Sequence, residues 1–168
     1  MSKIIFLDID GVLNSNFWNG EHQREISDGT LIDLEKVKLL RQIIDKTDAK
    51  IVLHSGWRFW FDSDAKPIRK EALRLVGMLE QEKLGIYDVT PDFSTEEIKR
   101  TRKFSLVKAS EILAWVEAHP EVSSWIVLDD LDLHSEEIEK HQIKTNQETG
   151  LTQENVEQAI RLLQCPIL

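Results

Sequence analysis

The chain has 168 residues, of which 41% are hydrophobic and 30% charged, and its formal net charge is −9. These values are typical of a globular protein with a sizeable core, and we expect one domain over residues 1–168. The acidic balance disfavours non-specific binding to duplex DNA or anionic membranes. No apolar run approaches the roughly 18 residues of a membrane helix. Because the N-terminus also lacks a secretory pattern, we expect a cytoplasmic protein without a membrane partner.

The first third of the chain alternates strand and helix signals. Lys3–Leu7 is an apolar, β-branched run that predicts a strand, and the polar and aromatic residues 14–30 predict a short flap. Apolar residues then recur at helical spacing over residues 31–44. Lys50–His54 predicts a second strand, and residues 57–66 predict a loop rich in aromatic side chains.

The rest of the chain continues this alternation. The expected elements, in order, are a helix over Pro67–Lys83, a strand over Ile86–Thr90, a helix over Leu106–His119, strands over Ser124–Leu128 and His141–Thr145, and a last helix with Thr152 as its N-cap. Strands that alternate with helices predict a three-layer, Rossmann-like α/β fold, in which a parallel sheet carries helices on both faces.

Two aspartates directly follow the first predicted strand. Asp8 and Asp10 are two positions apart, so in an extended chain their side chains point to the same side, roughly 7 Å apart. Gly11 then allows the backbone to turn away from the strand without a Cβ penalty. A structural turn or a structural calcium site is the simpler alternative. Paired carboxylates at the end of a central strand are better explained by a covalent phosphoryl-transfer site.

Polar groups also follow two other predicted strands. Ser55 comes after the second strand, Asp129 and Asp130 come after the fourth, and Lys108 opens a helix. In open α/β sheets the ligand site lies beyond the carboxyl ends of the strands, where these groups are expected to converge. Each has an ordinary alternative, because a serine or an Asp-Asp pair suits a turn and a lysine suits an exposed helix position.

The ordered set of motifs resembles a known superfamily. Asp8-Ile9-Asp10-Gly11-Val12-Leu13, then Ser55, Lys108 and Asp129-Asp130, resembles the haloacid dehalogenase (HAD) superfamily of phosphatases and phosphotransferases. Phe6–Asn14 with Ser55-Gly56-Trp57-Arg58 is similar to the small branch linked to Swiss Army Knife RNA repair proteins. That branch usually has two serines before Trp-Arg, where this chain has Ser55-Gly56.

The resemblance implies catalytic roles for four side chains. Asp8 would be the nucleophile that forms an aspartyl-phosphate. Asp10 would protonate the leaving oxygen and then activate water as a general base. Ser55 would hydrogen-bond the phosphoryl group, and Lys108 would neutralise its charge and restrain Asp8.

The resemblance also implies a magnesium ion. Its ligands would be Asp8, the main-chain carbonyl of Asp10 and Asp130, while Asp129 would orient these ligands or bind through water; hard oxygen ligands are what Mg²⁺ prefers. Electrostatics point the same way, because two like charges 4 Å apart repel by roughly 4 kcal/mol at an effective dielectric of 20. One lysine cannot balance four converging carboxylates.

The substrate is expected to be bulky. Residues 14–30 are too few for a large helical cap, so we predict an essentially capless enzyme with an open site. Aromatic side chains stack on bases and cations hold phosphates. The aromatic residues on predicted loops are Phe17, Trp18, Trp57, Trp60 and Phe61. The candidate cations are Arg58 and a basic cluster before Lys108, formed by Lys99, Arg100, Arg102 and Lys103. Simpler alternatives are core packing for the tryptophans, a solvated surface for the basic run, and an ion pair for Arg58.

The motifs and the resemblance lead to three candidate functions. The leading prediction is a Mg²⁺-dependent phosphatase that acts through an aspartyl-phosphate on nucleotides or on single-stranded nucleic-acid ends. The first alternative is a small-metabolite phosphatase or a phosphotransferase of the same superfamily. The second is a non-catalytic binding module, which the intact set of acids disfavours.

Overall fold

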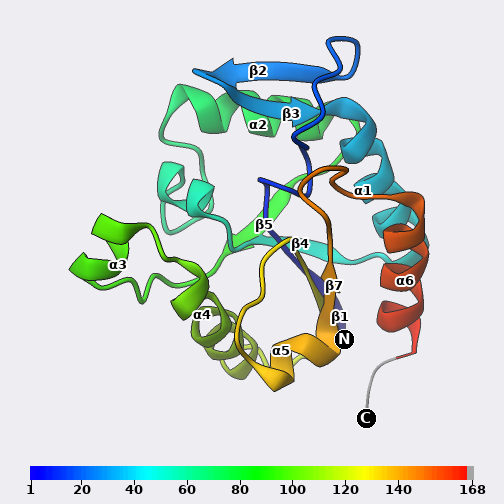
Figure 1. Ribbon diagram of the computed structural model, residues 1–168. Helices are drawn as coiled ribbons and strands as arrows, with labels where there is room; N and C mark the ends of the chain where they lie inside the picture. Colours follow the sequence, from blue (N-terminus) through cyan, green and yellow to red (C-terminus); the bar gives the residue numbers. More distant parts are fainter. Residues whose placement is uncertain (166–168) are drawn as a thin grey trace.

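The structure is a computed structural model that describes residues 1–165 (Figure 1). Five parallel strands form the central sheet in the order β5-β4-β1-β6-β7, and β2 pairs with β3 in a separate antiparallel hairpin. The strands are β1 (Ser2–Leu7), β2 (Gln23–Ser27), β3 (Thr30–Asp33), β4 (Lys50–Leu53), β5 (Ile86–Val89), β6 (Val122–Asp129) and β7 (Gln142–Lys144).

Helices cover both faces of the sheet. They are α1 (Leu34–Thr47), α2 (Lys70–Gln81), α3 (Glu96–Thr101), α4 (Ser105–Glu117), α5 (Glu136–His141), α6 (Gln153–Gln164) and the 3-10 helix η1 (Gly56–Trp60). Together with the parallel sheet, they confirm the expected three-layer, Rossmann-like fold. Among the described residues, no helix is both long and apolar enough to cross a membrane.

The alternation of side chains along β1 explains the two cores. Ile5 and Leu7 face one side, where they join the apolar residues of α1, α2 and α6. Ile4 and Phe6 face the other side, where Phe6 packs edge-to-face against Trp115 of α4 at a centroid distance of 5.4 Å. Because both faces of β1 are buried, its sequence is a continuous apolar run rather than an alternating one.

Two expected helix starts lie three residues too early, and the loop expected over residues 57–66 contains η1. Residues 31–33 belong to β3 instead of the following helix, because Asp33 is the N-cap of α1 and its side chain accepts the Glu35 N–H at 2.9 Å. The helix expected from Pro67 begins at Lys70, because Pro67 pairs with Phe61 in an antiparallel bridge. The second half of the predicted flap belongs to the β2–β3 hairpin, and the residues before Gln23 form turns and bends.

The order of the strands determines where a ligand site forms. From β1 the chain proceeds to β4 and β5 on one side, and then crosses to β6 and β7 on the other. The carboxyl ends of β1 and β6 therefore lie side by side at the point where the strand order reverses. Ligand sites of open α/β sheets form at such switch points.

Candidate active site

Asp8 lies at the centre of the carboxyl edge of the sheet. Its backbone N–H donates to the Leu128 carbonyl of β6 at 2.9 Å, and the His54 N–H donates to the Leu7 carbonyl at 3.1 Å, so both neighbouring strands fix the end of β1. The Asp8 side chain is buried. The carboxylate is thus held on a rigid element and not on a mobile loop.

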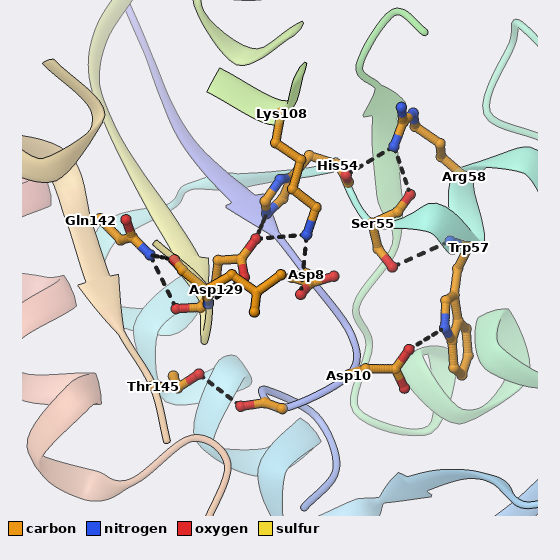
Figure 2. Close-up of polar contacts among 12 residues, drawn as sticks. Asp8, Asp10, His54, Ser55, Trp57, Arg58, Lys108, Asp129, Gln142 and Thr145 are labelled. Carbon is orange, nitrogen blue, oxygen red and sulfur yellow. Dashed lines mark hydrogen bonds and ion pairs between the residues drawn. The ribbon is translucent and has the colours of Figure 1, made fainter. Parts of the chain in front are cut away.

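Lys108 connects the two buried carboxylates at this edge. It lies in the first turn of α4, and its ammonium is 2.8 Å from Oδ2 of Asp129 and 3.4 Å from Oδ2 of Asp8 (Figure 2). Burial alone would lower the pKa of this lysine, but the two carboxylates outweigh that effect and raise it. Lys108 is therefore charged, and it is buried rather than at an exposed helix position, which was the ordinary alternative for this residue.

Three carboxylates converge beside this lysine. One oxygen from each of Asp8, Asp129 and Asp130 lies within 4.8 Å of the others. Burial raises the pKa of Asp8 to about 6, although Lys108 opposes the shift. Burial, followed by the charges of Asp129 and Asp8, raises the pKa of Asp130 to about 6. This set of hard oxygen donors, short of positive charge, fits a divalent cation such as Mg²⁺.

Gly11 allows Asp130 to approach the first motif. Its φ of +78° is in the left-handed region, and a Cβ at this position would lie 2.5 Å from Cγ of Asp130. The Gly11 carbonyl accepts the hydroxyl of Thr145 at 2.7 Å (Figure 2). Thr145 follows β7, so a third strand end helps to fix the turn.

Two cavities open around these acids. The first has a volume of about 350 Å³, and its lining includes Asp8, Ser55, Lys108 and Asp130. Ser55 accepts the Trp57 N–H at 3.2 Å, which leaves its hydroxyl proton free to donate into the cavity. The second has a volume of about 370 Å³ and shares Asp10 and Asp130 with the first. The two cavities consequently meet at Asp10 and Asp130.

The comparison with protein families agrees with this arrangement. Residues 4–156 match the model of the HAD domain in Swiss Army Knife RNA repair proteins. The chain belongs to this family. The match confirms the resemblance drawn from the motifs. The general class of the protein is therefore a hydrolase or phosphatase of the HAD type. No curated protein matches the chain.

In this HAD domain Trp57 lies at the cavity but is not an exposed aromatic platform. Its side chain belongs to the core, and the residue is only 5% exposed. Its indole N–H donates to Oδ2 of Asp10 at 3.0 Å (Figure 2). Oδ1 of the same carboxylate accepts the Asn14 amide at 2.9 Å. The sequence placed Trp57 near the substrate but gave no sign of its contact with Asp10.

Arg58 lines neither of the two cavities around the acids, and its side chain contacts other parts of the fold instead. Its guanidinium is buried and lies 2.6 Å from Oε2 of Glu111 on α4. A second nitrogen donates to the carbonyls of His54 and Ser55, each at 3.1 Å (Figure 2). Arg58 joins the turn that carries Ser55 to the helix that carries Lys108. An ion pair was an expected alternative, but the partners are Glu111 and, at 3.8 Å, Asp92, and not the acids of residues 62–64.

The basic residues before α4 separate into two kinds. Arg102, in the left-handed conformation after α3, lines the first cavity, whereas Lys103 is exposed and does not line it. Of the other aromatic residues expected near the site, Phe61 is buried, and Trp60 packs on Trp57 with the ring centroids 5.0 Å apart. Phe17 and Trp18 are 69% and 58% exposed.

The site includes residues that the motifs did not single out. Phe104 and Leu131 line the first cavity and give it an apolar wall. His54 is fully buried with Nε2 at 3.6 Å from Oδ2 of Asp129, and burial, followed by the charge of Lys108, lowers the pKa of its imidazole to about 3. His54 is therefore neutral. Its position directly before Ser55 was the one signal in the sequence that could have identified it.

Proposed function

We propose that this protein is a Mg²⁺-dependent phosphomonoesterase that acts through an aspartyl-phosphate. The observation that carries the proposal is the buried Lys108 ammonium between Asp8 and Asp129, beside Asp130, at the wall of an open cavity. This arrangement pairs a carboxylate nucleophile with fixed positive charge, as phosphoryl transfer requires.

Asp8 and Asp10 carry out the two chemical steps of the proposed reaction. An oxygen of Asp8 forms a bond to phosphorus while the bond to the leaving oxygen breaks, and Asp10 gives its proton to that oxygen. A water molecule then attacks the phosphorus of the aspartyl-phosphate and gives one proton to Asp10, while the bond between phosphorus and the Asp8 oxygen breaks. This second step releases inorganic phosphate and restores Asp8.

Two further side chains hold the phosphoryl group during both steps. The Ser55 hydroxyl donates to a phosphoryl oxygen, and the Lys108 ammonium balances its charge. Asp8, the Asp10 main-chain carbonyl and Asp130 would hold Mg²⁺, and Asp129 would keep Lys108 in place. When bound, the ion supplies charge neutralisation for the carboxylates and the phosphate.

The substrate we propose is a phosphate at a nucleotide or at a single-stranded nucleic-acid end. The cavity combines the cation Arg102 with the apolar side chains of Phe104 and Leu131, a combination suited to a phosphorylated group with an aromatic base. The second cavity leaves room for a substrate that extends past Asp10. The family name, which refers to RNA repair proteins, supports the same class.

The test begins with a generic aryl phosphate. We expect the purified protein to hydrolyse it with Mg²⁺ and to stop on addition of EDTA, whereas the Asp8→Asn variant, folded but without the nucleophile, releases no phosphate. A panel of nucleotides, oligonucleotides phosphorylated at the 5′ or 3′ end, sugar phosphates and phosphopeptides then ranks the substrates. Folded protein without metal-dependent phosphate release on the whole panel would refute the proposal, and a preference for sugar phosphates would refute its substrate class.

A further inference from the structure

We propose that Trp57 is a positioning residue, whose indole N–H fixes the Asp10 carboxyl group for proton transfer to the leaving oxygen. The inference rests on the proposed phosphatase reaction and assigns to Trp57 a task other than base stacking.

Asp10 needs support from other segments of the chain. It lies past the end of β1 and is exposed, so core packing does not fix the orientation of its side chain. Two neutral donors hold it from different segments, with Trp57 at 3.0 Å from Oδ2 and Asn14 at 2.9 Å from Oδ1. Each carboxyl oxygen has two lone pairs, so each keeps one for the transferred proton.

Trp57, in contrast, is held rigidly. Its ring is part of the main core and packs against Trp60 at a centroid distance of 5.0 Å. The Trp57 backbone is fixed as well, because its N–H donates to the Ser55 hydroxyl. The next residue, Arg58, attaches the same turn to Glu111. A rigid indole can therefore hold a mobile carboxyl group in one orientation.

The orientation of the Asp10 carboxyl group affects the rate of the reaction. General acid catalysis contributes roughly 10²- to 10⁴-fold, and it requires the proton within hydrogen-bond reach of the leaving oxygen. A poor leaving group such as an alkoxide needs the proton, whereas a nitrophenolate leaves without it. Loss of the Trp57 N–H therefore affects esters of poor leaving groups selectively, and a packing defect does not have this selectivity.

The experiment measures kcat/KM for a series of phosphate monoesters, from p-nitrophenyl through phenyl to alkyl phosphate, with Mg²⁺ present. Trp57→Phe keeps an aromatic ring and removes the N–H. We expect about tenfold loss on the alkyl ester and less than twofold on the p-nitrophenyl ester, so that the dependence on leaving-group pKa becomes steeper. Trp60→Phe, which disturbs the same aromatic pair without a contact to Asp10, is the matched control and should keep the wild-type slope.

A second variant keeps the test valid if Trp57→Phe does not fold. Replacement of Trp57 by β-(3-benzothienyl)alanine preserves the bicyclic shape and exchanges the N–H for sulfur, so it should give the same steeper slope. Equal loss across the whole ester series, or the same change in Trp60→Phe, would overturn the role assigned to Trp57. Wild-type protein that hydrolyses no ester would instead refute the proposed function, so the two failures are distinguishable.

Discussion

The ammonium of Lys108 and the carboxylate of Asp129 form an ion pair of 2.8 Å between two buried side chains. Asp8 is the third partner, at 3.4 Å from the same ammonium. One positive charge thus serves two buried carboxylates from neighbouring strands, and the loss of that charge affects both.

The first prediction concerns removal of this charge. Lys108→Met retains most of the side-chain volume but leaves the carboxylates of Asp8 and Asp129 without their cation. Removal of one partner of a buried pair costs about 3–5 kcal/mol, and urea unfolding of the metal-free protein at pH 7.5 should show a loss of that size. Lys103→Met, at an exposed position, is the control and should change the unfolding free energy by less than about 0.5 kcal/mol. Equal stability of the two variants would contradict the pairing.

The second prediction is that stabilisation by Mg²⁺ depends on pH. Burial raises the pKa of Asp8 and Asp130 from 3.8 to about 6 in the metal-free protein. The folded state therefore binds protons more tightly than the unfolded chain, and stability falls as the pH rises from about 4 through 6. Magnesium requires the deprotonated carboxylates, so it should raise the melting temperature clearly at pH 7.5 and little at pH 5. Thermal unfolding with Mg²⁺ or EDTA checks this, and the same shift at both pH values would contradict it.

The third prediction tests the contact between Gly11 and Asp130. An alanine Cβ at Gly11 would lie 2.5 Å from Cγ of Asp130, so Gly11→Ala should displace this carboxylate and abolish stabilisation by Mg²⁺. Gly29 has the same φ of +78° with no atom within 4 Å of the corresponding Cβ. Gly29→Ala therefore carries the same backbone strain, about 1–2 kcal/mol, and should keep the response to metal. Magnesium titrations followed by melting temperature separate the two variants.

The fourth prediction distinguishes a structural role of Arg58 from a role in substrate binding. Arg58→Met leaves Glu111 buried without its cation, which should cost about 3–5 kcal/mol. The double variant Arg58→Met/Glu111→Leu should lose less than the sum of the two single variants, because it removes both charges. KM should stay at the wild-type value at temperatures where the single variant is folded. A raised KM with unchanged stability would restore the expectation that Arg58 binds substrate.

The fifth prediction compares two adjacent cations. Arg102 lines the first cavity and Lys103 does not, so Arg102→Ala should raise KM for a phosphorylated oligonucleotide about tenfold, the typical effect of losing one hydrogen bond to a charged group. Lys103→Ala removes the same charge from the adjacent position and should change KM less than twofold. Similar effects in both variants would show that only the overall charge matters.

The sequence alone determined the features that depend on neighbouring residues. The apolar run of β1, its end at Asp8 and the alternation of strands with helices are local patterns, and they predicted the parallel fold and the edge at which the acids gather. The ordered motifs also predicted the family. Periodicity and chain order suffice for these features, because they arise from residues close in the sequence.

The tertiary structure decided which side chains meet. Only the pairing of β6 beside β1 places Asp129 and Asp130 next to Asp8, and only the packing of α4 selects Lys108 over Arg102 and Lys103 as the buried cation. The contacts of Trp57 with Asp10 and of Arg58 with Glu111 join residues 47 and 53 positions apart. No local pattern encodes such distances, because they result from the packing of whole elements around two cores.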